Sequence, residues 1–380
     1  MQEPTDPSLN QSRSGDQADR GDSAGPSGEC ALNSGTIFAT NLAADASVSK
    51  AEADGSLFAE PASESRPAMS SRAEEPTAQP KQAMDGSRLR PMLELMRVPA
   101  DRRLVLARIT AARAGIRLEA SGGLNIKMPL SLSHSLVLPT KLQMFGSTRD
   151  LFFSVQALLK KHVPMPTRDQ SLLTYWAMST WFPEFLPCLP SLVITGASSA
   201  ADVLLQTLVA VCRRPILLAE ANPAALRALP LGELMPTLLI RELQISGCMA
   251  ALLDASTQPG YLVANGKQFQ QAYCPKCIYI GEHPNDQPGW THSIHVHVGG
   301  SSARSLHRAP TKDVISDFHN RLLAYRFLSC DKVAASKYRV SAFRPEICTM
   351  AEALGAVVVD DTELQVGIAG CYKNAMSRRE

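Results

Sequence analysis

The sequence lacks any apolar run long enough to cross a membrane. A transmembrane helix needs roughly 18 uninterrupted apolar residues, and no window of the 380 residues approaches that length. Met1 is followed by polar residues, without the apolar stretch of a signal peptide. The nine cysteines are an odd number and do not form the even set of a disulfide framework. We therefore expect a soluble, cytoplasmic protein with reduced thiols and no membrane partner.

Residues 1–88 contain no Trp or Tyr, and Phe38 and Phe58 are their only aromatic residues. This segment is rich in Ser, Ala, Gly and Pro, and it carries 14 acidic and seven basic side chains. It cannot bury enough apolar surface to offset the entropy lost on ordering, so we predict a disordered N-terminal tail. The tail has a net charge of −7 and the remainder +9. A mildly basic body is compatible with a nucleic-acid partner, although no dense Lys/Arg run accompanies it.

The segment after the tail is rich in arginine. From Leu89 to Leu118 the apolar residues have helical spacing, which predicts an amphipathic helix with a basic face. Its arginines are Arg97, Arg102, Arg103, Arg108, Arg113 and Arg117. They indicate either a weak nucleic-acid contact or a solvated face with buried side-chain stems. Residues 122–142 are turn-rich and then β-like, so 89–145 is predicted to be a helical and β linker region.

From residue 146 onward, apolar strands alternate with helices. We predict strands at 192–194, 216–219, 237–240, 261–264, 278–280 and 294–298, and helices at 150–162, 169–182, 202–211, 223–228, 242–255, 311–330, 346–354 and 360–369. This alternation predicts an α/β fold with a sheet that is largely parallel in its first part. We assign residues 146–332 to this α/β domain and 333–380 to a helical C-terminal extension.

The stretch from Ser191 to Val211 has the layout of a phosphate-binding loop: a buried strand, a glycine turn at Gly196 and an apolar helix. The motif G-x-x-x-x-G-K-[ST] would require Gly, Lys and Ser or Thr at positions 201 to 203. The chain has Ala201, Asp202 and Val203 instead. The layout is therefore present without the residues that bind phosphate and magnesium.

The region from about residue 150 to 332 resembles the helicase-like P-loop ATPase domain found beside primases in plasmids and prophages, a family of unknown function. The resemblance rests on residues 172–181 (LLTYWAMSTW), 192–196, 212–215 (CRRP), 236–242 (PTLLIRE), 251–254 (ALLD), 275–281 (PKCIYIG) and 293–298. It implies a P-loop NTPase-like fold of the RecA/AAA type, with a mainly parallel sheet and flanking helices. The family's second motif, apolar-apolar-Asp-Glu, is here Leu239-Ile240-Arg241-Glu242, and its later Asp-Arg is here Thr291-His292.

The resemblance thus implies a degenerate nucleotide site without catalytic residues. Its positions are Gly196, Asp202, Val203, Arg241, Glu242 and His292. Without the lysine, the magnesium ligands and the arginine, little electrostatic stabilisation of phosphoryl transfer remains, so we expect neither ATP hydrolysis nor ATP and magnesium as cofactors. We expect an interaction or scaffold protein derived from mobile-element replication machinery, with a protein partner. The alternatives are an active ATPase or helicase-like motor with non-standard motifs, and a DNA-binding accessory protein.

Two of these replacements exchange a positive and a negative charge between two positions. In the resembled fold a lysine at 202 faces an aspartate at 241, and this chain has Asp202 and Arg241. If the strands that precede them are neighbours in a parallel sheet, both side chains emerge at its carboxyl edge. We predict that their charged groups lie within about 4 to 6 Å as a reversed ion pair. The alternative is that Asp202 is only an acidic residue near a helix start.

A possible zinc site is the remaining constellation. Cys274 and Cys277 have Cys-x-x-Cys spacing, and His295 and His297 would share one face of a later strand. Four such residues could hold a zinc ion. The alternative is a pair of buried thiols and two histidines on the face of a strand, and this is the interpretation that we prefer.

Overall fold

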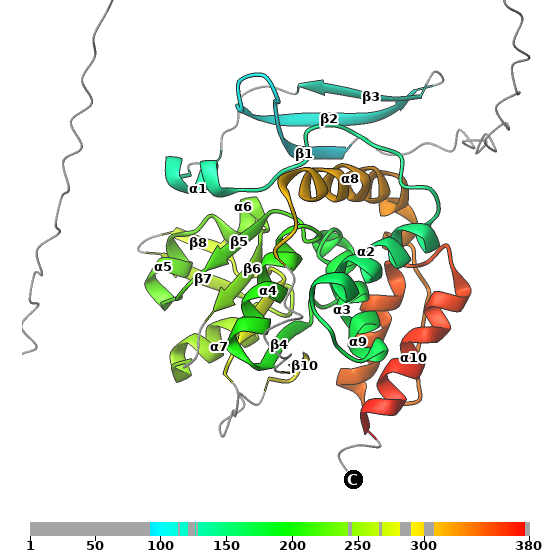
Figure 1. Ribbon diagram of the computed structural model, residues 1–380. Coiled ribbons are helices and arrows are strands. Elements are labelled where there is room, and N and C mark those ends of the chain that lie inside the picture. Colours follow the sequence, from blue (N-terminus) through cyan, green and yellow to red (C-terminus); the bar gives the residue numbers. More distant parts are fainter. Residues whose placement is uncertain are drawn as a thin grey trace, which may run out of the picture. The chain divides into compact units, whose positions relative to one another are not determined.

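The computed structural model describes residues 92–112, 115–120, 126, 128–241, 245–265, 268–281, 290–299 and 308–376, which all belong to the compact unit Pro80–Glu380. The predicted disordered tail at 1–88 lies outside the described residues. The described strands form a five-stranded sheet, a three-stranded sheet and a two-stranded hairpin (Figure 1).

The five-stranded sheet is parallel throughout. Its strands are β4 (Ser191–Gly196), β5 (Pro215–Leu218), β6 (Thr237–Arg241), β9 (Lys276–Tyr279) and β10 (Ser293–Val298). Their order is β10-β4-β9-β6-β5, and every neighbouring pair is parallel. Numbered along the chain, this is the order 5-1-4-3-2. The predicted α/β class, with a mainly parallel sheet and flanking helices, is therefore confirmed.

Both faces of this sheet are buried at its central strands β4, β6 and β9. In β4, Leu192 and Ile194 contribute to a core on one face, and Val193 contributes to a second core on the other. All three side chains are fully buried. A parallel sheet that is covered on both faces has strands that read as continuous apolar runs, and this explains why the sequence predicts these strands well.

Helices cover both faces of the sheet. The helices of ten or more residues are α2 (Thr148–His162), α3 (Thr167–Ser179), α4 (Ser198–Val209), α8 (Lys312–Ala334), α9 (Pro345–Ala356) and α10 (Thr362–Met376). They contribute to the first core, whereas α5 (Pro223–Ala228), α6 (Leu231–Leu234) and α7 (Gly247–Ala255) contribute to the second. The 3-10 helix η1 (Pro183–Phe185) precedes β4. Among the described residues, no helix is long and apolar enough to span a bilayer.

The strand predicted at 261–264 is not part of the main sheet. It corresponds to β7 (Leu262–Asn265), which pairs only with β8 (Gln268–Gln271) among the described strands, as an antiparallel hairpin. The buried side chain of Val263 faces inward, whereas Leu262 and Phe269 are exposed. One-sided burial distinguishes this hairpin from the central strands β4, β6 and β9 of the main sheet, which are buried on both sides.

The helix predicted at 89–118 is wrong. The described residues of this segment form β1 (Met92–Arg97), β2 (Leu104–Ala112) and β3 (Gly115–Ala120), which make an antiparallel sheet in the order β1-β2-β3. Leu95 and Met96 are adjacent in the chain and both buried, because both faces of β1 are covered. Consecutive apolar residues on a strand covered on both faces imitate the spacing of an amphipathic helix.

The β-like structure predicted within 122–142 is also wrong. Its described part, which is residue 126 and residues 128–142, contains no strand and includes the short helix α1 (Leu130–Ser135). Beyond this helix, Leu136 and Leu138 are buried in the same core as Leu95. The apolar residues of this segment therefore cover the three-stranded sheet instead of extending it.

A buried cluster of charges joins the three-stranded sheet to the main domain. Glu94 of β1 is 1% exposed and forms ion pairs with Arg213 (2.9 Å), Arg214 and Arg326 (3.1 Å). Glu184 of η1 binds Arg213 and Arg326 at 3.0 and 2.9 Å. Burial alone would raise the pKa of Glu94, but the three guanidinium groups outweigh it and hold the pKa well below its ordinary value.

Lys276, the first residue of β9, is buried without exposure to solvent. Its ammonium group donates a hydrogen bond to the hydroxyl of Ser256 at 2.7 Å. Burial lowers the pKa of Lys276 from 10.5 to about 8, because the charged form loses its hydration. The folded state therefore releases this proton more readily than the unfolded chain does.

We expect this lysine to make the protein more stable at alkaline pH. Between pH 8 and 10.5 the unfolded chain binds more protons at this residue than the folded protein, so the free energy of unfolding should rise by about 3 kcal/mol over that window. Urea unfolding at a series of pH values would measure it. Lys276→Met should abolish this rise and stabilise the protein at pH 7, whereas Lys160→Met, at an exposed lysine, should leave the rise intact. An equal rise in both variants would contradict the assignment.

Candidate functional site

The turn between β4 and α4 is very short. Gly196 ends β4 with φ +110°, Ala197 is the N-cap, and the helix begins at Ser198. The N–H groups of Gly196 and Ala197 donate to the carbonyl oxygens of Gly281 and Val298, each at 3.0 Å. A phosphate-binding loop presents such N–H groups to the ligand. Here these two donors are used within the protein, and residues 198–201 form the first turn of α4.

Asp202 and Arg241 form an ion pair at the carboxyl edge of the sheet, as the exchange of signs predicts. The Nε of Arg241 donates to one carboxylate oxygen of Asp202, and Nη2 donates to the other at 3.3 Å. Nη2 also donates to the Ser198 hydroxyl at 2.9 Å. The hydrogen bonds that Arg241 donates to the Asp202 carboxylate raise the pKa of Arg241 above its ordinary value. The side chains are 37% and 40% exposed, so solvent screens the pair considerably.

The strands that lead to this ion pair are not neighbours, which corrects the expectation from the sequence. β9 lies between β4 and β6 in the sheet. The pair forms nevertheless, because Asp202 lies in the second turn of α4, and this helix contacts β6 as well as β4. A shallow pocket of about 350 Å³ adjoins the pair, and its other lining residues are Leu205, Gln206, Leu217, Leu218 and Ala219.

The other predicted nucleotide-site positions are not all brought to this edge. Val203, at the position of the magnesium-binding hydroxyl, is half-buried and packs against the core. Glu242 lies outside the described residues. His292 precedes β10 and accepts a hydrogen bond at its carbonyl from the N–H of Ser191, the first residue of β4 (2.9 Å). It is therefore at the amino-terminal edge of the sheet, opposite the ion pair. Burial lowers its pKa.

The structure does not bring the four candidate zinc ligands together. Cys277 is in register with Leu192 and faces the first core, whereas Cys274 is part of the second core on the other face of the sheet. His295 and His297 lie on β10, which β4 separates from β9. Burial raises the pKa of Cys274 to about 11 and that of Cys277 well above its ordinary value. In the described part of the chain, no group of three or more His, Cys, Asp or Glu side chains could hold a metal ion.

The six arginines of the predicted basic helix have different environments. Arg97 is held by the carbonyl groups of Arg102, Ser133 and Leu136, at 2.9, 2.7 and 2.9 Å. It serves to attach α1 to the sheet. Arg113 lies outside the described residues, and the exposed members are Arg102, Arg103, Arg108 and Arg117. Arg103 pairs with Asp101. A weak nucleic-acid contact through these arginines stays a prediction.

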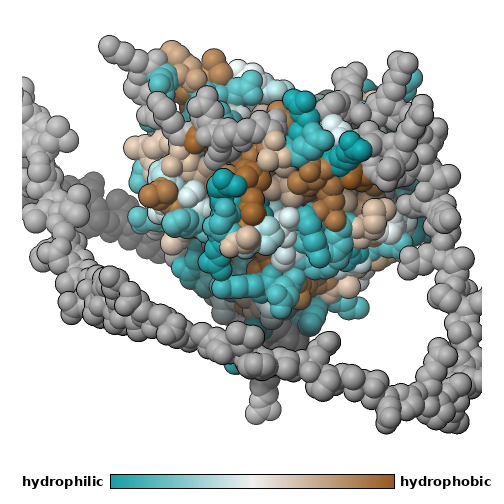
Figure 2. Space-filling model, turned by 90° about the horizontal axis from the view of Figure 1, so that it is seen from above, coloured by the Kyte–Doolittle hydropathy of each residue, from teal (hydrophilic) through white to brown (hydrophobic). Residues whose placement is uncertain are grey.

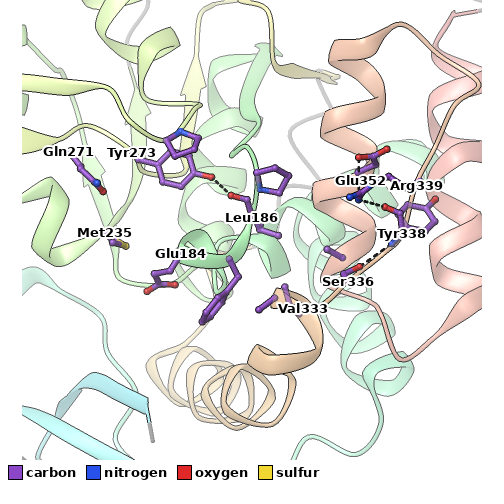
Figure 3. A pocket seen from close by; sticks show the side chains of 15 residues that line it. Glu184, Leu186, Met235, Gln271, Tyr273, Val333, Ser336, Tyr338, Arg339 and Glu352 are labelled. Carbon is purple, nitrogen blue, oxygen red and sulfur yellow. Dashed lines mark hydrogen bonds and ion pairs between the residues drawn. The ribbon is translucent and has the colours of Figure 1, made fainter. Parts of the chain in front are cut away.

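Three features of the structure have no counterpart in the sequence reasoning. One is the contact of Thr195 on β4 with His297 on β10, where the hydroxyl lies 3.2 Å from Nδ1. The second is the buried charge cluster around Glu94. The third is an open pocket of about 530 Å³ at the amino-terminal edge of the sheet, in which Glu184 and Glu352 lie on opposite sides (Figure 3). No local sequence pattern marks any of them, because each joins residues that are far apart in the chain.

The described body is thus an α/β protein with an ion pair at the carboxyl edge of its parallel sheet, the edge at which open α/β sheets bind ligands. No family model matches the sequence, and no curated protein matches it either. Among solved structures, it is similar to a full-length MCM homolog from Methanopyrus kandleri, with 11% identity over 75% of this chain and 76% of the other, and a TM-score of 0.39.

Two apo structures of the NrS-1 C-terminal region are also similar to this chain. One has 11% identity over 64% of this chain and 57% of the other, with a TM-score of 0.31. The second has 8% identity over 62% of this chain and 65% of the other, with a TM-score of 0.30.

Proposed function

We propose that this protein is a P-loop ATPase-like protein that does not hydrolyse ATP and acts through macromolecular contacts as an interaction or scaffold protein. The observation that carries the proposal is the Asp202–Arg241 ion pair with its hydrogen bond to Ser198. In an active site of this fold, phosphate and magnesium occupy the space beside the corresponding lysine and aspartate. Here a guanidinium takes the place of the metal, and a carboxylate repels incoming phosphate.

The short turn after β4 supports the same proposal. Because α4 starts at Ser198, residues that would form a wide loop around phosphate are helical, and the N–H groups of Gly196 and Ala197 already have acceptors. Nucleotide binding would require the first turn of α4 to unwind and the ion pair to break. The origin in mobile-element replication machinery rests on the sequence resemblance, and it is part of the proposal.

We expect the purified protein to show no magnesium-dependent ATP hydrolysis above background and no increase in melting temperature with Mg·ATP. A coupled phosphate-release assay and thermal unfolding with and without nucleotide measure the two quantities. A second preparation carrying Glu242→Gln provides the control, because Glu242 is the one acidic residue of the family's second motif that this chain keeps. Turnover that is present in the natural protein and lost in this variant would show an active ATPase with non-standard motifs.

A further inference from the structure

β3 is an edge strand of its sheet, and no described strand pairs with its outer side. Among the described strands it pairs only with β2, and it is the strand of its sheet that lies farthest from α8 (Figure 1). Residues 117–120 are all exposed. The strand contains no proline, so its free edge offers N–H and C=O groups to a further strand. Seen from this side, the molecule shows apolar patches among hydrophilic ones (Figure 2).

Leu118 continues a row of core residues onto this free edge. It is in register with Ile109, which is in turn in register with Met92. Ile109 and Met92 are buried in the core, but Leu118 is 42% exposed. We call the face of the sheet that carries these three residues the inner face. An additional strand beside β3 would cover Leu118 and extend the inner face.

The sequence of β3 is self-complementary about Leu118. Arg117 and Glu119 flank this leucine and both lie on the outer face, because successive side chains of a strand alternate. Ile116 and Ala120 lie on the inner face with Leu118. When such a strand is turned around a two-fold axis through Leu118, positive charge meets negative charge on one face and apolar residues meet on the other.

We propose that β3 pairs antiparallel with β3 of a second copy of this chain, about a two-fold axis at Leu118. Arg117 then lies opposite Glu119 of the second copy, and Glu119 lies opposite Arg117 of that copy. The leucines meet at the axis, and the two three-stranded sheets become one continuous sheet. A closed two-fold pairing uses both free edges, so it ends with a dimer and does not continue into a filament.

The two registers on either side of this pairing are unfavourable. In an antiparallel pair, residues directly opposite each other point to the same face, so the axis can shift only by whole residues. An axis at Arg117 would place that arginine opposite itself, and an axis at Glu119 would place the glutamate opposite itself. Like charges directly opposite each other are destabilising. The charge pattern therefore favours the register centred on Leu118 over its two neighbours.

A nucleic acid fits this edge less well than a second copy. Residues 92–120 contain no aromatic side chain on which a base could stack. Arg117 is followed two residues later by Glu119 on the same face, so the strand does not present a continuous positive surface. Strand addition uses the backbone groups and the exposed leucine, which a phosphate contact would leave unused.

Sedimentation velocity of the full chain over a range of concentrations tests the proposal. We expect a dimer, and either Arg117→Glu or Glu119→Arg should raise its dissociation constant on the order of tenfold to hundredfold, since two cross-strand pairs become repulsive. An equimolar mixture of these two variants should associate again, because each negative strand then faces a positive one. The double variant with both substitutions should also dimerise, as its charge pattern is again self-complementary.

Re-association in the mixture distinguishes the proposed pairing from a simple loss of folding. A natural chain that stays monomeric up to about 100 μM would overturn the proposal. Single variants that dimerise as well as the natural chain would also overturn it, as would a mixture that stays dissociated while circular dichroism shows both variants folded. A third outcome would assign the edge to nucleic acid instead. In that case the natural chain is a monomer without oligonucleotide, it binds the oligonucleotide, and Arg117→Glu alone abolishes this binding.

Discussion

Replacing Glu94 by glutamine should lower the free energy of unfolding by about 3 to 5 kcal/mol. The carboxylate is 1% exposed and contacts three guanidinium groups, from Arg213, Arg214 and Arg326. If Glu94 lost its charge, Glu184 would be the only acidic partner left to these arginines within the cluster. An amide of the same shape cannot compensate buried positive charge, so the loss reflects uncompensated charge more than altered packing.

Urea unfolding at pH 7 measures this loss, and Glu220→Gln, at an exposed glutamate, is the matched control that should change stability by less than about 0.5 kcal/mol. The pH dependence gives a second measurement. The pKa of Glu94 is depressed in the folded state, so its stabilisation is present above the unfolded value near 4.5 and is lost as the pH falls below it. The variant should lack this part of the acid sensitivity. A loss of less than about 1 kcal/mol would contradict the proposed role.

Replacing Gly196 by alanine should also destabilise the protein, by about 3 kcal/mol or more. Its φ of +110° is unfavourable for residues with a side chain. In addition, a Cβ at this position would lie 2.0 Å from the carbonyl oxygen of Val298, a backbone atom of β10. The strand end cannot move away without breaking the hydrogen bond from Ala197 to the same oxygen.

Gly260 separates the two contributions to this effect. It also has a positive φ, +96°, but a Cβ there would meet no atom within 4 Å. Gly260→Ala should therefore report backbone strain alone, about 1 kcal/mol, and the excess loss in Gly196→Ala should report the steric conflict with β10. Chemical denaturation of both variants gives the comparison, provided that the denaturant dependence is unchanged. If both variants lost the same free energy of unfolding, the end of β10 would be able to move aside at little cost.

The sequence predicts correctly the strands that are buried on both faces and flanked by helices. β4 and β6 are buried on both faces and flanked by helices, so their apolar runs identify them directly. The segment at 89–118 misleads because Leu95 and Met96 face different cores. The position of β9 between β4 and β6 could not be read from the chain, because strand order within a sheet leaves no local pattern.

The candidate site was predictable only in part, for a related reason. The meeting of Asp202 and Arg241 follows from a family motif and from the rule that parallel strand ends share an edge. His292 lies at the opposite edge of the sheet because it directly precedes β10. A motif alignment does not show at which residue a strand begins. The cluster around Glu94 is the clearest omission, because its partners are 119 to 232 residues away in sequence.

That separation also has a consequence for the order of synthesis. β1, β2 and β3 follow one another in the chain, so their sheet can pair as soon as they leave the ribosome. Arg326 emerges 232 residues after Glu94, which takes roughly 10 to 50 s at ordinary translation rates. Arg213 and Arg214 emerge earlier, but the cluster around Glu94 stays incomplete during this interval. The three-stranded sheet can therefore pair early, whereas the charge cluster that joins it to the main domain is completed only after α8 has been translated.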